Sequence, residues 1–315
     1  MKDLRAALAL LNDENKLNNS TFARVLVDIL RDYGENFDYE ELIKGLRSVS
    51  ANSSGHRGEA AKYALNSLET EDLEPYTQYL YELDDSGINF VTIFDSKYPD
   101  NLWWIEDLPL AVYVDGYVES SRANVSIVGT RDATDARIEF TRKTAQSLAD
   151  KGFNVVSGLA SGIDAAAHEG ALNSGGNTTA ILPGDIQSIY PKSNAELAAE
   201  IREEGSLLSE ISKFEPMHKG RYIERNRITS GISDVVVVIA SGETGGTVRQ
   251  AEIAKRQAKF RFLYCPDDDD GQSPQKIREM GFKQFKTLDE LEDLIEESLS
   301  SSNPSMSKKM TLNDF

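Results

Sequence analysis

Apolar side chains recur at spacings of three and four through the first part of the chain. Leu4, Leu8 and Leu11 share one helical face, and groups of the same kind recur as far as Leu68. This period is typical of amphipathic helices. The pattern therefore predicts a small all-helical domain over residues 1–86.

After that region the pattern changes to short, continuous apolar runs. In chain order they are FVTIF, AVYVDG, SIVG, NVVSG, TTAILPG, SLLSE, VVVVIASG and FRFLYCP. Helical stretches separate most of them, near residues 135–150, 162–174, 193–204 and 246–258, and a short strand and an amphipathic helix follow within 281–299. Apolar strands between helices are typical of a parallel sheet covered on both faces. The chain is predicted to be an α/β protein, with a doubly wound parallel sheet over residues 87–299 and a flexible tail over 300–315.

The charge balance limits which surfaces can meet nucleic acid. The 315 residues include 34 Lys and Arg against 52 Asp and Glu, a formal net charge of −18. Such a chain is repelled by DNA and by anionic membranes unless positive charge gathers locally. Residues 1–90 hold 9 basic and 17 acidic residues, whereas residues 213–227 hold five basic and two acidic, and residues 249–261 five basic and one acidic. The helical domain is thus predicted to be a poor DNA surface, and the two basic segments better ones.

Several classes of protein are disfavoured by what the chain contains. A single cysteine, Cys265, excludes an internal disulfide framework, and His56, His168 and His218 lie too far apart in sequence to suggest a metal site. The first residues carry charge and no long apolar core, unlike a signal peptide. The most apolar run, Val235–Ala240, is far shorter than the ~20 residues that span a bilayer. We expect a cytoplasmic protein without a membrane partner.

Three predicted strands end in loops rich in Gly, Ser or Thr that lead into helices. These loops cover residues 129–134, 157–164 and 241–247. Ligands of open parallel sheets bind beyond the carboxyl ends of the strands, glycines allow close approach, and free N–H groups at helix starts attract anions. Glycines can also serve turn geometry alone, but three such loops on one edge favour a phosphate-bearing ligand.

Common nucleotide and hydrolase motifs are missing. No strand is followed by G-x-G-x-x-G or by a P-loop, which disfavours a dinucleotide and a P-loop ATPase. Ser161 in GLASG is one residue out of register with a nucleophile elbow. His168 is interpreted as a packed helix-face residue rather than a catalytic base. The RNR run at 225–227, beside the glycine loops, indicates phosphate contacts from several arginines rather than a solvated helix face.

These motifs, in this order, resemble the DNA-processing protein A family (DprA, also called Smf). The resemblance lies in GTR at 129–131, SGLASGIDAAAHEGAL at 157–172, RNRITSGIS at 225–233 and the segment 88–116. It covers about residues 88–265. It implies an extended Rossmann-like fold that binds and protects single-stranded DNA and helps to load a RecA-type recombinase, in DNA uptake, recombination or repair. It also implies no enzymatic activity, no cofactor and a homodimer.

Carried over motif by motif, the resemblance places the DNA pocket at the three loops and the RNR run. Its predicted residues are Gly129, Thr130, Arg131, Ser157, Gly158, Ser161, Gly162, Asp164, Lys219, Arg221, Arg225, Asn226, Arg227, Gly245, Gly246 and Thr247. The arginines would contact phosphates, and Phe214 or Tyr222 would stack on a base. Asp164 is repelled by phosphate, so we interpret it as a helix N-terminal residue or as a partner that orients an arginine.

An alternative within the same superfold is a nucleotide-binding sensor or a phosphoribohydrolase of the cytokinin-activating type. Those hydrolases use P-G-G-x-G-T-x-x-E with a catalytic glutamate, and this chain has Gln250 at that position. An amide cannot act as the acid/base carboxylate, and Glu252 lies about 200° further round the helix. We therefore expect binding rather than hydrolysis.

The end of the chain suggests a further partner. Leu312 and Phe315 have the i, i+3 spacing of the aliphatic and aromatic anchors in the clamp-binding peptides of archaeal and eukaryotic replication proteins. Lys309 stands where those peptides have glutamine, and a second aromatic residue is missing. The tail is either a sliding-clamp ligand or a chain end with a chance Leu and Phe.

Overall fold

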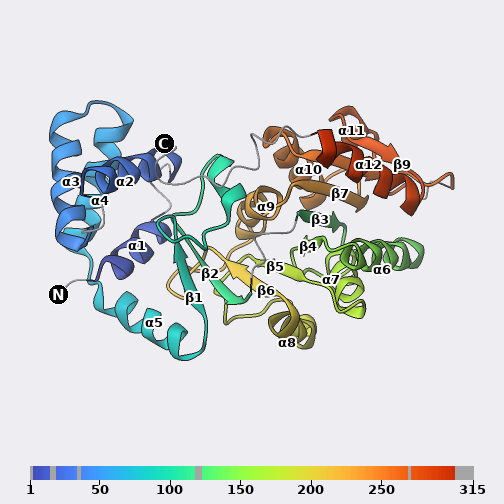
Figure 1. The fold of residues 1–315 in the computed structure, drawn as a ribbon, viewed down its shortest axis with the longest axis horizontal. Coiled ribbons are helices and arrows are strands. Elements are labelled where there is room, and N and C mark those ends of the chain that lie inside the picture. Colours follow the sequence, from blue (N-terminus) through green and yellow to red (C-terminus); the bar gives the residue numbers. More distant parts are fainter. Residues whose placement is uncertain (1–2, 15–18, 34–36, 118–122, 269–270, 302–315) are drawn as a thin grey trace.

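A computed structural model describes residues 3–14, 19–33, 37–117, 123–268 and 271–301 (Figure 1). Within these ranges the strands form a single nine-stranded sheet, in the order β1-β2-β6-β5-β4-β3-β7-β8-β9. The strands are β1 (Asn89–Thr92), β2 (Ala111–Gly116), β3 (Asn124–Gly129), β4 (Asn154–Ser157), β5 (Thr178–Leu182), β6 (Ser206–Ser209), β7 (Val235–Ala240), β8 (Phe260–Tyr264) and β9 (Lys283–Phe285). Leu312 and Phe315 lie outside the described residues, so the clamp hypothesis stays a prediction.

The sheet is mixed. Strands β3 to β9 pair in parallel, as the sequence predicts, whereas β1 pairs antiparallel with β2, and β2 antiparallel with β6. The two antiparallel strands are joined by a connection that contains the short 3-10 helix η2 (Asp100–Trp104). The predicted α/β doubly wound fold is confirmed, with an antiparallel extension at one edge that the apolar runs alone did not reveal.

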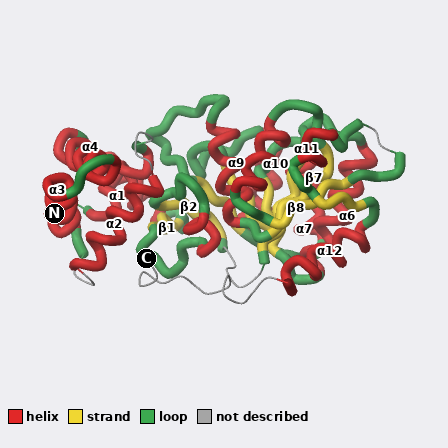
Figure 2. The backbone as a smooth tube through the Cα atoms, turned by 90° about the horizontal axis from the view of Figure 1, so that it is seen from above, coloured by secondary structure: helices red, strands yellow, loops and turns green. Residues whose placement is uncertain are grey.

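Helices cover both faces of the sheet, which explains the continuous apolar strands (Figure 2). The helices that follow β3 are α6 (Asp135–Asp150), α7 (Ile163–Asn173), α8 (Ala195–Glu204), α9 (Arg221–Ile232), α10 (Gly246–Arg256), α11 (Gln275–Glu279) and α12 (Leu288–Ser301), with the 3-10 helix η3 (Lys192–Asn194) before α8. In β7, Val235 and Val237 pack with α6, α7 and α12, while Val236 and Val238 pack with α10 and α11 on the opposite face. Because side chains alternate between faces along a strand, only a sheet buried on both sides has apolar residues at every position.

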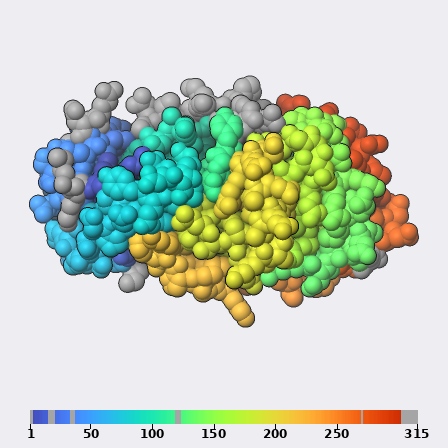
Figure 3. Space-filling model, turned by 90° about the horizontal axis from the view of Figure 1, so that it is seen from below, coloured from blue at the N-terminus to red at the C-terminus, as the bar shows by residue number. Residues whose placement is uncertain are grey.

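The N-terminal helices extend the molecule at one end, opposite α11 and α12 (Figures 1 and 3). They are α1 (Leu4–Asp13), α2 (Asn19–Tyr33), α3 (Tyr39–Asn52), α4 (His56–Thr70) and α5 (Glu74–Asp85). Helix α1 joins the sheet directly: Asn12 Nδ2 donates to the carbonyl of Glu210 at 2.9 Å, and Asn12 Oδ1 accepts from the N–H of Ala111 at 3.1 Å. One apolar cluster runs from α1 through β1 and β2 to α8. The division at residue 86 stays a prediction, and the hydrophobic core crosses it.

Two helices, α9 and the short α11, are not among those that the apolar pattern predicts, and α9 is the one that borders the predicted site. In the sequence the α9 residues form only a basic segment, because their apolar positions follow no clear helical period. Helix α9 packs beside α10 on the sheet face opposite α7 (Figure 1). No helix of the described ranges is both long and apolar enough to cross a membrane.

Candidate nucleic-acid interface

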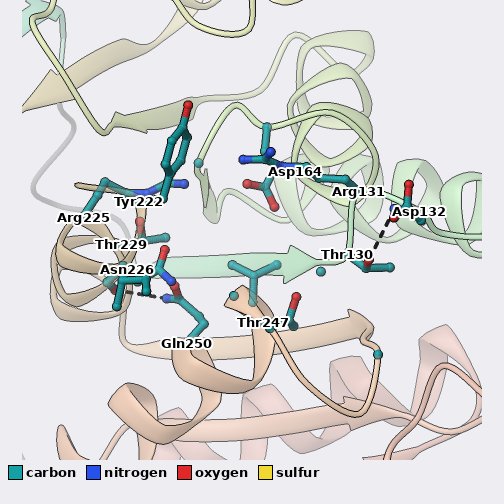
Figure 4. Close-up of a pocket in the computed structure, with 18 of the residues that line it drawn as sticks. Thr130, Arg131, Asp132, Asp164, Tyr222, Arg225, Asn226, Thr229, Thr247 and Gln250 are labelled. Carbon is teal, nitrogen blue, oxygen red and sulfur yellow. Dashed lines mark hydrogen bonds between the residues drawn. The ribbon is translucent and has the colours of Figure 1, made fainter. Parts of the chain in front are cut away.

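The strand order reverses at β3, which has β4 on one side and β7 on the other. A pocket of about 470 Å³ lies beyond the carboxyl ends of these strands (Figure 4). Its walls are the loops after β3, β4 and β7, the start of α10 and one face of α9. Open α/β sheets bind ligands in this crevice, at the topological switch point.

Two glycines bring the walls close together. A Cβ atom on Gly158 would collide with the guanidinium of Arg225, so only glycine lets this arginine lie against the loop after β4. Gly162 has a φ of +83°, and a Cβ atom there would lie 2.7 Å from the carbonyl oxygens of Thr130 and Arg131. These positions require glycine for packing between loops, and the same close approach builds the pocket.

Arg225 and Asp164 are the buried charges of the pocket. Each is at most 8% exposed, and neither forms an ion pair among the residues that the structure describes. Arg225 Nη1 donates to the carbonyl of Ile181 at 2.6 Å. Burial lowers the pKa of Arg225, and the attraction of Asp164 offsets part of that change. Burial likewise raises the pKa of Asp164, against the attraction of Arg225 and hydrogen bonding from nearby N–H groups.

Asp164 lies in the first turn of α7, where the sequence analysis expected it. Its carboxylate is placed on the same side of the pocket as Arg131, across from Arg225, Asn226 and Thr229 (Figure 4). A first-turn carboxylate stabilises the helix N-terminus. Its charge also attracts the Arg225 guanidinium, which offsets part of the effect of burial on the pKa of that arginine.

The rim of the pocket is aromatic and cationic. The Arg131 guanidinium stacks over the ring of Tyr222, with Cζ 5.2 Å from the ring centre, and Tyr222 meets Tyr190 edge-on at 6.2 Å between centres. Tyr190 is exposed and Tyr222 half-buried. Such a rim offers π faces to bases and a charge to phosphates. Phe214, the other aromatic residue predicted to stack on a base, does not line the pocket: its ring packs on Tyr76 at 4.6 Å between ring centres.

The floor is polar. Gln250 is buried and donates its Nε2 hydrogen to the carbonyl of Asn226 at 3.1 Å. The Thr229 hydroxyl is buried, and it has no hydrogen-bond partner among the described residues. Neither Thr229 nor Tyr190 is among the site residues that the sequence predicts. Thr229 follows Arg225 by one helical turn, so recognition of α9 as a helix would have placed both on one face.

The structure brings most of the predicted site residues together. The pocket is lined by Gly129, Thr130, Arg131, Gly158, Asp164, Arg225, Asn226, Gly245, Gly246 and Thr247. Gly162 packs against the backbone of Thr130 and Arg131, which line the pocket. Ser157 is buried, and its hydroxyl donates to the carbonyl of Ile127 at 2.7 Å. Ser161 and Lys219 are exposed and do not line it.

Two predicted phosphate contacts point elsewhere. Arg221 is 2% exposed and pairs with Glu215 and with Glu224, the latter at 3.1 Å. Arg227 pairs with Glu210 and, at 3.5 Å, with Asp107. Neither arginine lines the pocket. Only part of the positive charge counted in this segment therefore faces the pocket, because carboxylates outside the RNR run neutralise Arg221 and Arg227.

His168 is fully buried, and its Nδ1 lies 2.8 Å from the Thr178 hydroxyl. Burial lowers its pKa to about 3. The interpretation of His168 as a packed helix residue is confirmed. Within the described ranges, no three His, Cys, Asp or Glu side chains gather as metal ligands would.

Comparison with known proteins identifies relatives. A family model described as DNA recombination-mediator protein A matches residues 89–296. The chain is 31% identical over 225 residues to the DNA processing protein DprA of Bacillus subtilis, which covers 70% of this chain and 76% of that protein. It is 37% identical over 188 residues to the protein Smf of Synechocystis, covering 58% of this chain. The matched region spans only about half, 47%, of that Synechocystis protein.

Solved structures agree on the fold. The DNA processing protein A of Streptococcus pneumoniae superposes with a TM-score of 0.71 at 24% identity, over 93% of this chain and 98% of that one. The DNA processing protein A of Helicobacter pylori, whose structure was solved for its single-stranded DNA binding mode, has a TM-score of 0.59 at 26% identity. That match covers 66% of this chain and 96% of the other.

Proposed function

The chain belongs to the DNA recombination-mediator protein A family, and on this premise we propose that its switch-point pocket binds single-stranded DNA. Phosphates lie at the glycine loops and the two pocket arginines, Arg131 and Arg225, while bases stack on the rim at Tyr222. Phosphate contacts and stacking carry little sequence information, so binding tolerates most sequences and weakens with salt.

The observation that carries this proposal is Arg225, a buried guanidinium without an ionic partner in the described part of the chain. A buried charge costs free energy unless another group compensates it. Asp164 compensates it only in part, since burial still lowers the pKa of Arg225. A phosphate at the start of α10 would supply the missing charge, and the N–H groups there favour an anion.

The shape of the site favours a single strand over a duplex. The cations and glycine loops line a pocket rather than a flat surface, and the stacking faces lie at its entrance. The bases of a duplex are already stacked and paired, so they can neither enter the pocket nor stack on the aromatic faces at its entrance. The single-stranded DNA binding described for the Helicobacter pylori protein supports the same assignment here.

The alternative of nucleotide hydrolysis finds no support at Gln250. Its amide is buried and committed to the Asn226 carbonyl, so it holds α9 against α10. We therefore propose that the protein binds and does not cleave its ligand. Fluorescence anisotropy with a labelled 20-mer, single-stranded and duplex, tests this together with thermal shifts by nucleoside monophosphates. Weaker binding of the duplex is expected. Equal affinity for duplex, or release of free base from a monophosphate, contradicts the proposal.

We propose three partners besides DNA. A RecA-type recombinase would receive the bound strand, a second copy of the chain would form a homodimer, and a sliding clamp would bind the tail through Leu312 and Phe315. All would meet the protein in the cytoplasm. Calorimetry of a peptide of residues 300–315 against a trimeric clamp tests the last partner. Absence of heat at high-micromolar clamp removes it, and a Leu312→Ala/Phe315→Ala peptide is the control.

A further inference from the structure

The segment between β5 and α8, residues 183–194, is held near its start by the helical domain. The hydroxyl of Tyr79, on α5, donates to Asp185 Oδ1 at 2.7 Å, although the two residues lie 106 positions apart in the chain. Tyr79 is fully buried, and burial together with the Asp185 carboxylate raises the pKa of Tyr79 above its ordinary value, so the hydroxyl stays protonated and remains a donor. A hydrogen bond to an ionised acceptor is stronger than one between neutral groups. The segment therefore has a specific bond to a part of the fold that lies far from it in sequence.

The same carboxylate shapes the turn that leads to Tyr190. Asp185 Oδ2 accepts from the Ser188 hydroxyl at 3.1 Å, and the carbonyl of Asp185 accepts from the Ser188 N–H at 2.9 Å. Tyr190 follows two residues later, and its exposed ring meets Tyr222 edge-on at the rim of the pocket. Hydrogen bonds thus run from α5 to the turn directly before a rim residue.

The far end of the segment reaches the pocket loop after β4. Asn194 Nδ2 donates to the carbonyl of Leu159 at 3.0 Å. Leu159 is buried and has a φ of +58°, in the left-handed region that a leucine rarely adopts. Its neighbours Gly158 and Ala160 line the pocket. Because both ends of the segment are held, the position of Tyr190 between them depends on these contacts.

We propose that Tyr79 is a positioning residue for the DNA site: its hydroxyl, through Asp185, holds Tyr190 where the ring meets Tyr222 and offers the bound strand a second aromatic face. This inference rests on the single-stranded DNA binding proposed above. The helical domain, none of whose described residues lines the pocket, thereby influences how the strand is held at its entrance.

Loss of this hydroxyl shifts the rim without unfolding the segment. Ile186 is fully buried in the hydrophobic core, and Ile189 packs against the same core, so the segment stays on the body of the protein when the bond from Tyr79 is absent. These apolar contacts carry little directional information, whereas a hydrogen bond fixes the turn in one orientation. The bond therefore acts on where Tyr190 lies and has a smaller part in whether the chain folds.

Tyr79→Phe tests the proposal, because it removes only the hydroxyl. The ring keeps its contacts with the Lys213 ammonium and with Phe214. Affinity for a labelled 20-mer single strand is expected to fall about threefold, less than the full contribution of one stacked base, with an unchanged salt dependence. Tyr81→Phe is the matched control, since it makes the same change on the same helix at a side chain that is 64% exposed, and it should leave the affinity unchanged. Unchanged affinity in Tyr79→Phe overturns the inference and leaves the proposed function intact, whereas no binding by the parent protein overturns the proposed function itself.

Two variants of Asp185 identify the hydrogen bond as the cause. Both Asp185→Asn and Asp185→Ala lose the charge, but only asparagine keeps an oxygen that accepts from the Tyr79 hydroxyl. Asp185→Asn is therefore expected to bind the single strand about threefold more tightly than Asp185→Ala, the same factor that Tyr79→Phe loses. Equal affinity of the two variants overturns the assignment.

A double-mutant cycle shows whether the effect passes through the rim. In a Tyr190→Leu background the ring that Tyr79 positions is gone, so Tyr79→Phe is expected to cause no further loss of single-stranded DNA affinity. A hydroxyl that only stabilised the fold would act independently of Tyr190, and the effects of independent sites add. The same loss from Tyr79→Phe in both backgrounds overturns the positioning role.

Discussion

The two sides of helix α9 carry the same kind of side chain and use it differently. On the pocket side, Arg225 is buried without an ion pair within the described residues. On the other side, two residues along, Arg227 pairs with Glu210 and Asp107. Burial alone would lower the pKa of both guanidinium groups. At Arg227 the two carboxylates outweigh burial, so its pKa is raised. At Arg225 the attraction of Asp164 does not outweigh burial, so its pKa is lowered. An arginine that already has its anion stabilises the fold, and one that lacks it is available for a ligand.

The strongest test of this difference is Arg227→Ala. It leaves the Glu210 carboxylate, which is 8% exposed, without its cation, and breaking a buried ion pair from one side costs about 3 kcal/mol. We expect that loss in the free energy of unfolding, measured by urea denaturation, and little change in single-stranded DNA affinity. The double variant Arg227→Met/Glu210→Leu should recover most of the stability. A large loss of DNA affinity in folded Arg227→Ala would show that the two sides are not separate.

The complementary change is Arg225→Lys. Lysine keeps the charge but loses the planar donor fork that reaches both the Ile181 carbonyl and the pocket. We expect single-stranded DNA affinity to fall about tenfold, with a smaller loss of stability than in Arg227→Ala. Anisotropy titrations at several salt concentrations measure it. Unchanged affinity would remove Arg225 from the site.

The free energy of unfolding is expected to depend on pH through Asp13, at the end of α1, which contacts the segment before α9. Asp13 is buried, its Oδ2 accepts hydrogen bonds from the Ser212 hydroxyl and, at 3.1 Å, from the Tyr76 hydroxyl, and Glu215 lies near enough to repel it. Burial raises the pKa of Asp13 from 3.8 to about 7. The folded protein therefore holds this proton more tightly than the unfolded chain, so the group stabilises the fold at low pH and loses that contribution as the pH rises from about 4 to about 7.

Lowering the pH from 8 to 6 should accordingly add about 1.4 kcal/mol to the free energy of unfolding through Asp13. Denaturation of the parent and of Asp13→Asn at both pH values isolates this contribution, because the variant keeps every other titrating group. If the two proteins show the same pH dependence, Asp13 does not titrate in this range.

The smallest expected effect lies at the rim. Tyr222→Leu removes the ring that stacks on Arg131 and faces Tyr190, and base stacking is worth about 1 kcal/mol or more. Single-stranded DNA affinity should fall about fivefold without a change in its salt dependence, since no charge is lost. Phe214→Leu is the control, because that ring packs on α5. A changed salt slope in Tyr222→Leu would mean that the ring acts only by holding Arg131.

The sequence predicted the strands and the glycine loops well, because both depend on local signals. The valines of β7 and the glycines at 158 and 162 need only their neighbours to be interpreted. The two sides of α9 could not be separated in this way. Arg227 finds Glu210 seventeen residues earlier and Asp107 on another element, so its pairing depends on tertiary structure. A count of basic residues adds paired and unpaired arginines together.

The junction of α1 with the sheet has a consequence for how the chain acquires its structure. Asn12 bonds to Glu210, which is 198 positions later, whereas α3, α4 and α5, which also pack on α1, follow it closely in the chain. A ribosome releases α1 and these helices long before Glu210 exists, so the apolar side of α1 can be partly covered early while Asn12 still lacks this partner. Contacts of such long sequence separation slow folding. The bond from Asn12 to Glu210 is therefore among the last contacts of α1 to form.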